Sequence, residues 1–127
     1  NIDAAGLSDR CRCVAIDMLE GVPDGAIAYI MANVIQSFDD DHGVRVLGNC
    51  RRAMKEGGRV LVVEMIIPGP SEPHLSKLGD IEMLVHTDGG RERTRQEYEA
   101  LYERAGLRVT RIIPTASPWS IVEGVAN

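Results

Sequence analysis

The chain has 127 residues and a mass of 13.9 kDa, which is enough for one small domain with a modest core. Its formal net charge is −5 and only 4% of its residues are aromatic, which argues against a nucleic-acid partner on both charge and base stacking. No apolar run approaches the roughly 20 residues that a membrane span needs, so we also expect no membrane partner.

Four elements are predicted in the first half of the chain from the spacing of its apolar residues. Cys11–Ile16 and Ala26–Ala32 are short apolar or alternating segments, which is typical of strands. Over Asp40–Lys55 the apolar residues recur at helical spacing, and the glycine pair that follows would end this helix. Arg59–Ile67 contains an unbroken apolar core, which favours a parallel strand that is buried on both faces.

The second half is predicted to hold two helices and two strands. Apolar residues at helical spacing indicate a helix across 75–84. A capping-box pattern formed by Thr94 and Glu97 begins another helix. Leu107–Pro114 and Ser120–Val125 look like strands that a short turn joins, so they would pair antiparallel. The element order predicts the α/β class, with a mostly parallel sheet and a C-terminal antiparallel hairpin.

Ligands of open parallel sheets bind beyond the carboxyl ends of the strands, so the residues at those ends are the candidates for a site. The predicted strands and the loop over 88–93 place six such residues at one rim: Asp17, Met18, Asn33, Gln36, Glu64 and Glu92. This pattern predicts a small-molecule site on the sheet and does not name the reaction.

Each candidate also has a purely structural interpretation. Asp17 can cap a turn, and Met18 is more often a core residue than a cofactor contact. Asn33 and Gln36 can be solvated loop residues. Glu64 is different, because a carboxylate that ends an apolar buried strand is costly unless it is paired or used. For Glu92, which stands between two arginines, spacing alone favours a surface ion pair.

Other kinds of site find little support in the sequence. Cys11 and Cys13 share one strand face but have no second ligand pair, so we expect no metal. The three histidines have no obvious serine or cysteine partner for a hydrolytic triad. No G-x-G-x-x-G or Walker pattern is present. The odd number of cysteines does not make a disulfide framework, so we expect a cytoplasmic protein.

Six pieces of the sequence, taken in order, are together similar to one family. They are Asp17-Met18, Phe38-Asp39-Asp40-Asp41-His42, Asn49–Met54, Val62-Val63-Glu64, Asp80–Leu84 and Gly89-Gly90-Arg91-Glu92-Arg93-Thr94. The chain resembles the S-adenosylmethionine-dependent small-molecule O-methyltransferases of the caffeic-acid and acetylserotonin type, and most of all their bacterial members that act on polyketide-like hydroxyls. The resemblance runs from about Leu7 to Val125.

The resemblance implies a Rossmann-like methyltransferase fold, a reaction and roles for particular residues. S-adenosylmethionine would donate a methyl group to a hydroxyl of an aromatic or polyketide-like small molecule, leaving S-adenosylhomocysteine. The residues expected around the cofactor are Asp17 and Met18 at the adenine, Ala32 and Asn33 on the methionine side, and Phe38 nearby. Met83 and His86 would line the acceptor pocket. Glu64 and Glu92 match the two acidic residues that orient the family's catalytic histidine.

That histidine is replaced here, because the family's usual His-Asp-Trp corresponds to Gln36-Ser37-Phe38. A glutamine amide can orient an acceptor by hydrogen bonding, but it cannot take its proton. Gln36 therefore leaves two interpretations open: transfer to an already acidic hydroxyl, or a homologue that keeps the fold and cofactor but does different chemistry.

The family's Gly-rich first strand-turn and its N-terminal dimerisation domain have no counterpart in the sequence. We therefore expect residues 1–127 to be the C-terminal portion of a methyltransferase domain whose N-terminal strands are missing, from a full-length protein that is a homodimer. Unpaired sheet edges would follow, so a non-catalytic binding or assembly module is the remaining alternative.

Overall fold

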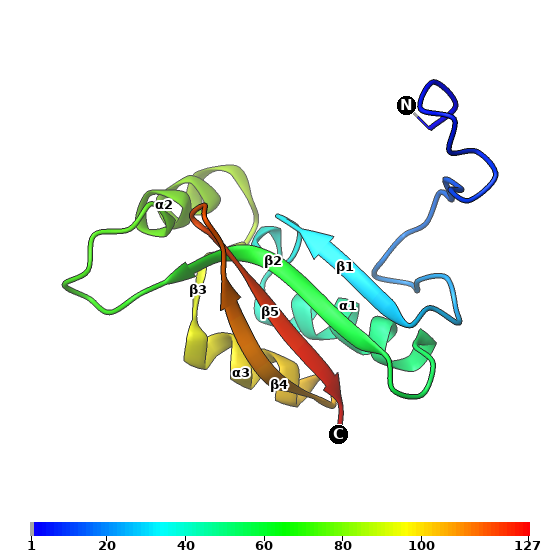
Figure 1. Cartoon of the computed structure of the whole chain (residues 1–127). Coiled ribbons are helices and arrows are strands. Elements are labelled where there is room, and N and C mark those ends of the chain that lie inside the picture. Colours follow the sequence, from blue (N-terminus) through cyan, green and yellow to red (C-terminus); the bar gives the residue numbers. More distant parts are fainter. Residues whose placement is uncertain (1) are drawn as a thin grey trace.

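The computed structural model describes residues 2–127 and is built around one mixed sheet (Figure 1). Strand β1 (Ala28–Ala32) pairs parallel with β2 (Arg59–Ile67). On its other side β2 pairs antiparallel with β5 (Trp119–Ala126), and β5 pairs antiparallel with β4 (Leu107–Pro114). The order across the sheet is therefore β1-β2-β5-β4, with β2 in a central position.

A very short strand decides where the site residues meet. β3 (Arg93–Thr94) pairs parallel with the carboxyl end of β2, with Arg93 opposite Ile66. This pairing brings the loop over 88–92 beside the last residues of β2. The short 3-10 helix η1 (Ile35–Ser37) follows the carboxyl end of β1 and lies at the same edge.

Two helices cover one face of the sheet, and the main core lies between them and the strands (Figure 1). They are α1 (Asp40–Ala53) and α3 (Arg95–Arg104). The core contains Leu47 and Cys50 of α1, Val62 of β2 and Tyr102 of α3. Tyr102 packs so tightly on the sheet that a Cβ at Gly124 would meet its ring, which explains the glycine in the middle of β5.

The predicted elements from Ala26 onward are confirmed, with β2 and β4 beginning and ending at the predicted residues. The N-cap of α1 is Asp39, whose side chain accepts from the His42 N–H. Thr94 and Glu97 form the predicted capping box of α3. These features are local, so the residues that form them can be recognised in the sequence.

The predicted strand over Cys11–Ile16 is wrong, because residues 11–17 form an exposed, irregular segment. A strand needs a neighbour to pair its N–H and C=O groups. None of the five strands of the described chain lies beside this segment, so the sheet contains less parallel pairing than expected.

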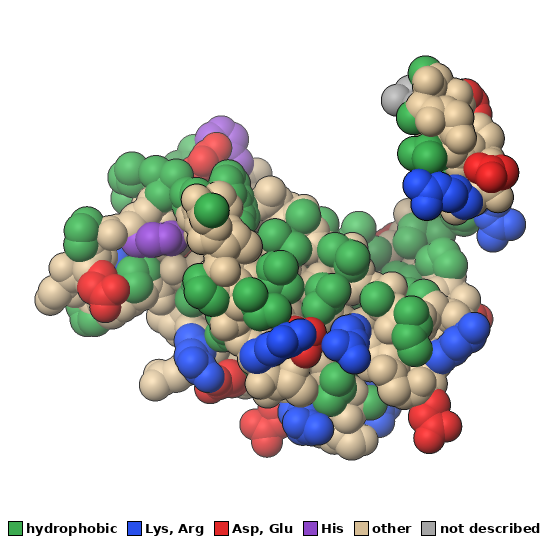
Figure 2. All heavy atoms as spheres, in the orientation of Figure 1, with side chains coloured by type: hydrophobic (Ala, Val, Ile, Leu, Met, Phe, Trp, Pro, Cys, Tyr) green, Lys and Arg blue, Asp and Glu red, His purple; other side chains and the backbone are tan. Residues whose placement is uncertain are grey.

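Helix α2 (Ser76–His86) forms as predicted, but its apolar residues face outward. Leu78, Ile81 and Leu84 are 65%, 60% and 78% exposed. Figure 2 shows hydrophobic side chains gathered over the front of the sheet and over the region of α2. The apolar surface of this helix is therefore not part of the core within residues 2–127.

Candidate active site

Glu64 is fully buried on β2, and both of its carboxylate oxygens are occupied by hydrogen bonds. Oε1 accepts from the backbone N–H groups of Val34, Ile35 and Gln36 at 3.0, 2.6 and 3.2 Å. Oε2 accepts from the Tyr98 hydroxyl at 2.5 Å. The buried charge is thus satisfied by four donors, and the carboxylate fixes the backbone that carries Gln36.

The same backbone is held from its carbonyl side by Arg93, whose side chain is also fully buried. Its Nη1 donates to Ile35 O at 3.1 Å and its Nη2 donates to Phe38 O at 2.9 Å. The guanidinium also pairs with Asp40 at 2.8 Å. Glu64 binds the N–H groups of the turn around Gln36, and Arg93 binds its carbonyl groups. The backbone that carries the Gln36 side chain is therefore fixed.

Glu92 is 2% exposed and its Oε2 has no hydrogen-bond partner within residues 2–127. The expected surface ion pair does not form, because Arg91 pairs with Asp40 and Glu97 instead. Burial and then the charges of Glu64 and Asp80 raise the pKa of Glu92 from 4.5 to about 7, although Arg93 opposes the shift. Glu92 therefore differs from Glu64, since it is a buried carboxyl group with a free oxygen.

The loop before β3 rests on η1, so the segment that carries Glu92 adjoins the segment that carries Gln36. A Cβ at Gly90 would lie 2.6 Å from the Gln36 carbonyl oxygen, so only glycine allows this close approach. The Gln36 side-chain oxygen is buried and, like Glu92 Oε2, has no donor in the described chain. Two unsatisfied acceptors thus lie on adjoining segments.

The residues expected around a cofactor are less completely assembled. Met18 O accepts from Asn49 of α1 at 2.7 Å, so Asp17 and Met18 lie against the second half of this helix. Asp17 Oδ1 accepts from Leu19 N–H at 2.9 Å, which is the turn-capping contact. No hydrogen bond among residues 2–127 links these two residues to Glu64, Gln36 or Glu92.

Ala32, Asn33 and Phe38 lie at the expected edge of the sheet. Ala32 ends β1, and Asn33 follows it with a positive φ of 54°. The Asn33 side-chain oxygen accepts from Trp119 Nε1 at 2.8 Å, so it is engaged by the C-terminal hairpin. Phe38 follows η1, and its ring stacks on His42 with centroids 6.3 Å apart.

A hollow of about 520 Å³ lies between α2 and the loop before β3. Glu92 lines it together with Asp80, Ile81 and Leu84 of α2. The two residues expected to contact the acceptor do not line this hollow: Met83 is half-buried, and His86 is exposed at the end of the helix. The lining combines the apolar side chains of Ile67, Ile81 and Leu84 with four charged ones, Asp80, Arg91, Glu92 and Glu97. Such a mixed lining suits a molecule with an apolar body and a hydrogen-bonding group.

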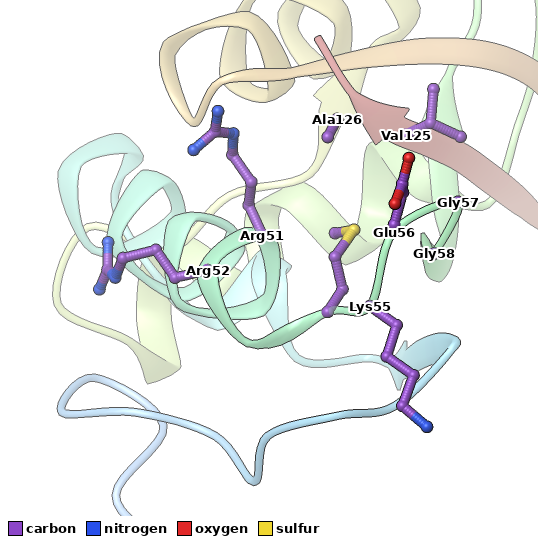
Figure 3. A pocket seen from close by; sticks show the side chains of 9 residues that line it. Arg51, Arg52, Lys55, Glu56, Gly57, Gly58, Val125 and Ala126 are labelled. Atoms are coloured by element: carbon purple, nitrogen blue, oxygen red, sulfur yellow. The ribbon is translucent and has the colours of Figure 1, made fainter.

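Figure 3 shows a second hollow at the opposite end of the sheet, where α1 ends and β2 begins. Its lining includes the basic residues Arg51, Arg52 and Lys55. Arg59 at this end and Glu64 are five residues apart, which is about 17 Å along an extended strand. This second hollow is therefore separate from the site around Glu64 and Glu92.

Neither a metal cluster nor a membrane span was found in the described chain. No three His, Cys, Asp or Glu side chains among residues 2–127 are placed to hold a metal ion. No helix within these residues is both long and apolar enough to cross a membrane.

A family model described as an O-methyltransferase domain matches residues 2–108. The chain belongs to the O-methyltransferase family. Among its relatives, the phenazine O-methyltransferase of Lysobacter antibioticus is 40% identical over 119 residues, covering 94% of this chain and 35% of the relative. The mitomycin biosynthesis 6-O-methyltransferase of Streptomyces lavendulae is 41% identical over 119 residues, covering 93% and 34%.

Solved O-methyltransferase structures have the same fold. A methyltransferase of calicheamicin biosynthesis, solved with S-adenosylhomocysteine, has a TM-score of 0.91 and 37% identity, covering 100% of this chain and 38% of its own. An O-methyltransferase of neocarzinostatin biosynthesis, solved with S-adenosylmethionine and 2-hydroxy-5-methyl naphthoic acid, has a TM-score of 0.87 and 33% identity, covering 99% and 36%. The chain thus spans about a third of the length of the relatives it matches.

Three residues that organise the surroundings of Glu64, Gln36 and Asn33 were not singled out in the sequence. Tyr98 donates to Glu64, Arg93 donates to the η1 backbone, and Trp119 donates to Asn33. Their contacts span between 34 and 86 residues of sequence, so no local pattern could reveal them.

Proposed function

We propose that the protein transfers a methyl group from S-adenosylmethionine to a hydroxyl of an aromatic or polyketide-like small molecule. The observation that carries the proposal is the arrangement of Gln36, Glu64 and Glu92 at the carboxyl edge of a sheet whose fold matches O-methyltransferases. Glu92, which has a free carboxyl oxygen, lines a hollow whose apolar and charged side chains suit an aromatic acceptor with a hydroxyl. Relatives named for mitomycin and phenazine methylation support the class of acceptor.

The residues present fit one side of S-adenosylmethionine. Asp17 Oδ2 makes no hydrogen bond within residues 2–127 and is therefore available to the adenine amino group. Met18 would pack on the adenine ring, while Ala32, Asn33 and Phe38 would line the methionine side. When bound, the sulfonium supplies an electrophilic methyl group. We propose that residues 1–127 form the C-terminal portion of the catalytic domain and that this portion supplies the acceptor side of the site.

The chain's own residues would orient the acceptor. Glu64 and Arg93 fix the backbone of Gln36, and the Gln36 amide would then hydrogen-bond the acceptor oxygen. Fixing the acceptor in line with the methyl group can supply a large part of a methyl-transfer rate. We also propose that the full-length enzyme is a homodimer and is located in the cytoplasm.

The direct test incubates the protein at its natural length with S-adenosylmethionine labelled in the methyl group and a panel of naphthols, hydroxyphenazines and hydroxyquinones. We expect label to enter at least one hydroxyl. The matching arylamines serve as the comparison, since transfer only to nitrogen would contradict a hydroxyl acceptor. Label in no panel member would contradict the proposed function.

The substitution Gln36→His tests the consequence of the missing histidine. Because a positioned base typically contributes 10²–10⁴-fold, we expect the variant to methylate an accepted phenol about tenfold or more faster at pH 7. The rate is measured at saturating S-adenosylmethionine, with Gln96→His on the exposed surface of α3 as the control. If Gln36→His gives no gain on any accepted phenol, the absence of a histidine at position 36 does not limit the reaction.

A further inference from the structure

Three packed segments present the side chains that can act on an acceptor hydroxyl. Glu64 comes from β2, Gln36 from η1 and Glu92 from the loop before β3. β3 pairs with β2 two residues beyond Glu64, and Gly90 packs directly on the Gln36 carbonyl. The positions of the three residues relative to one another are therefore set by the sheet and by one close backbone contact.

Only one of these three can accept a proton without losing a hydrogen bond. The Gln36 amide is not basic at neutral pH, so it cannot take the proton. Glu64 uses Oε1 for three N–H donors and Oε2 for the Tyr98 hydroxyl. Burial and then the neighbouring Glu64 charge raise the pKa of Tyr98 well above 10, so the hydroxyl keeps the proton that it donates. Glu92 Oε2 remains free and buried.

Unsatisfied buried acceptors are rare in folded proteins and call for an explanation. Here two of them, Glu92 Oε2 and Gln36 Oε1, occur on adjoining segments, and both lack a donor. A ligand that donates a hydrogen would satisfy one or both. An acceptor hydroxyl is such a ligand, and Glu92 lines the hollow that could hold it.

We propose that the Glu92 carboxylate is the general base of this protein and takes the proton of the acceptor hydroxyl. The inference rests on the proposed function. The acceptor oxygen forms the new bond to the methyl carbon while its O–H bond breaks and the proton moves to Glu92 Oε2. The electron pair of the broken carbon–sulfur bond stays on sulfur, which becomes a neutral thioether. Glu92 then returns its proton to water.

The charges around Glu92 favour this role at neutral pH. Glu64 of β2 and Asp80 of α2 face it with negative charge, and Arg93 of β3 faces it with positive charge. Burial and the two carboxylates dominate, so the pKa of Glu92 lies at about 7. A base is most effective when its pKa is close to the working pH. The rate should therefore rise as the pH increases through about 7, where Glu92 loses its proton.

The test uses the natural-length protein and a hydroxyaromatic that the labelling panel has identified. For Glu92→Gln we expect kcat at pH 8 to fall by about 10²-fold, with KM changed less than about threefold, because general-base help is typically worth at least this much. The wild-type rise of kcat through pH 7 should disappear. The loss should shrink for a nitro-substituted acceptor, whose hydroxyl is already ionised, and on addition of Gln36→His. Glu103→Gln, an exposed change on α3, is the matched control.

Each other outcome has a definite meaning. If the methylation rate of Glu92→Gln stays within about threefold of the wild-type rate at every pH, the role of Glu92 is overturned. The proposed function still stands in that case. Absence of methylation by the wild-type protein would overturn the proposed function, and this inference with it. If Glu92→Gln does not fold, Glu92→Asp is measured instead. A midpoint of kcat against pH identical to that of wild type would then overturn the assignment.

Discussion

At the scale of single residues, the two buried glutamates of the site have opposite environments. Glu64 receives four hydrogen bonds, so its burial is compensated and it stabilises the turn at η1. Glu92 has a free oxygen and two acidic neighbours, so its charged form is costly. The chain keeps this unfavourable carboxyl group where the proposed chemistry needs a proton acceptor, as is common at functional sites.

The raised pKa of Glu92 predicts a pH-dependent change in stability. Its folded value of about 7 exceeds the ordinary 4.5, so the folded state binds the proton more tightly than the unfolded state. The stabilising contribution is complete below about pH 4.5 and is lost as the pH rises through 7. Glu92→Gln should therefore raise the free energy of unfolding at pH 8 relative to wild type, by about 3 kcal/mol at most, and should have little effect near pH 4.5.

Urea unfolding of both natural-length proteins at pH 5 and pH 8 measures this difference. Glu103→Gln, the exposed control, should show none at either pH. A Glu92→Gln effect of equal size at both pH values would show that the pKa of Glu92 is not raised.

At the scale of elements, α3 connects local capping to the site. Thr94 and Glu97 begin the helix, and Tyr98 in its first turn donates to Glu64. A well-formed helix start therefore holds the phenol in the position where it satisfies the buried carboxylate.

Thr94→Ala removes the N-cap acceptor for the Glu97 N–H. We expect a loss of about 1 kcal/mol in the free energy of unfolding, the usual cost of replacing an N-cap threonine. Thermal or urea unfolding checks the value against Ser71→Ala, an exposed loop change for comparison. A loss no larger than that of Ser71→Ala would mean that the capping box contributes little.

At the scale of the whole molecule, one face of the sheet is covered by α1 and α3, while the apolar residues of α2 stay exposed (Figures 1 and 2). The chain spans about a third of the length of its relatives. Within residues 2–127, Asp17 and Met18 have no hydrogen bond to the glutamates, so the residues proposed to bind the cofactor are only partly brought together.

This arrangement predicts that residues 1–127 alone bind S-adenosylmethionine weakly or not at all, because only part of the cofactor would find contacts. Isothermal titration calorimetry on this segment and on the natural-length protein gives the comparison, with circular dichroism to establish that the segment is folded. We expect measurable binding only at natural length. Micromolar binding by the folded segment would contradict the partial site.

The sequence by itself determined the longer helices and strands from Ala26 onward, since hydrophobic period, caps and glycine stops are local signals. The short elements η1 and β3 were not predicted. It also identified Glu64 as a functional candidate, because a carboxylate in an apolar strand stands out without any partner being known. For Cys11–Ile16 the local pattern was misleading, because a strand depends on a neighbour that the sheet does not provide.

Only the tertiary structure decided which of the two glutamates has its hydrogen bonds satisfied. Glu92 looked like part of a surface ion pair, but Asp40 and Glu97 take up Arg91, and the pairing of β3 with β2 buries Glu92. Tyr98 and the η1 backbone reach Glu64 from about 30 residues away. Hydrogen bonds and charges act through space, so the fold alone decides which carboxylate is satisfied and which remains free to accept a proton.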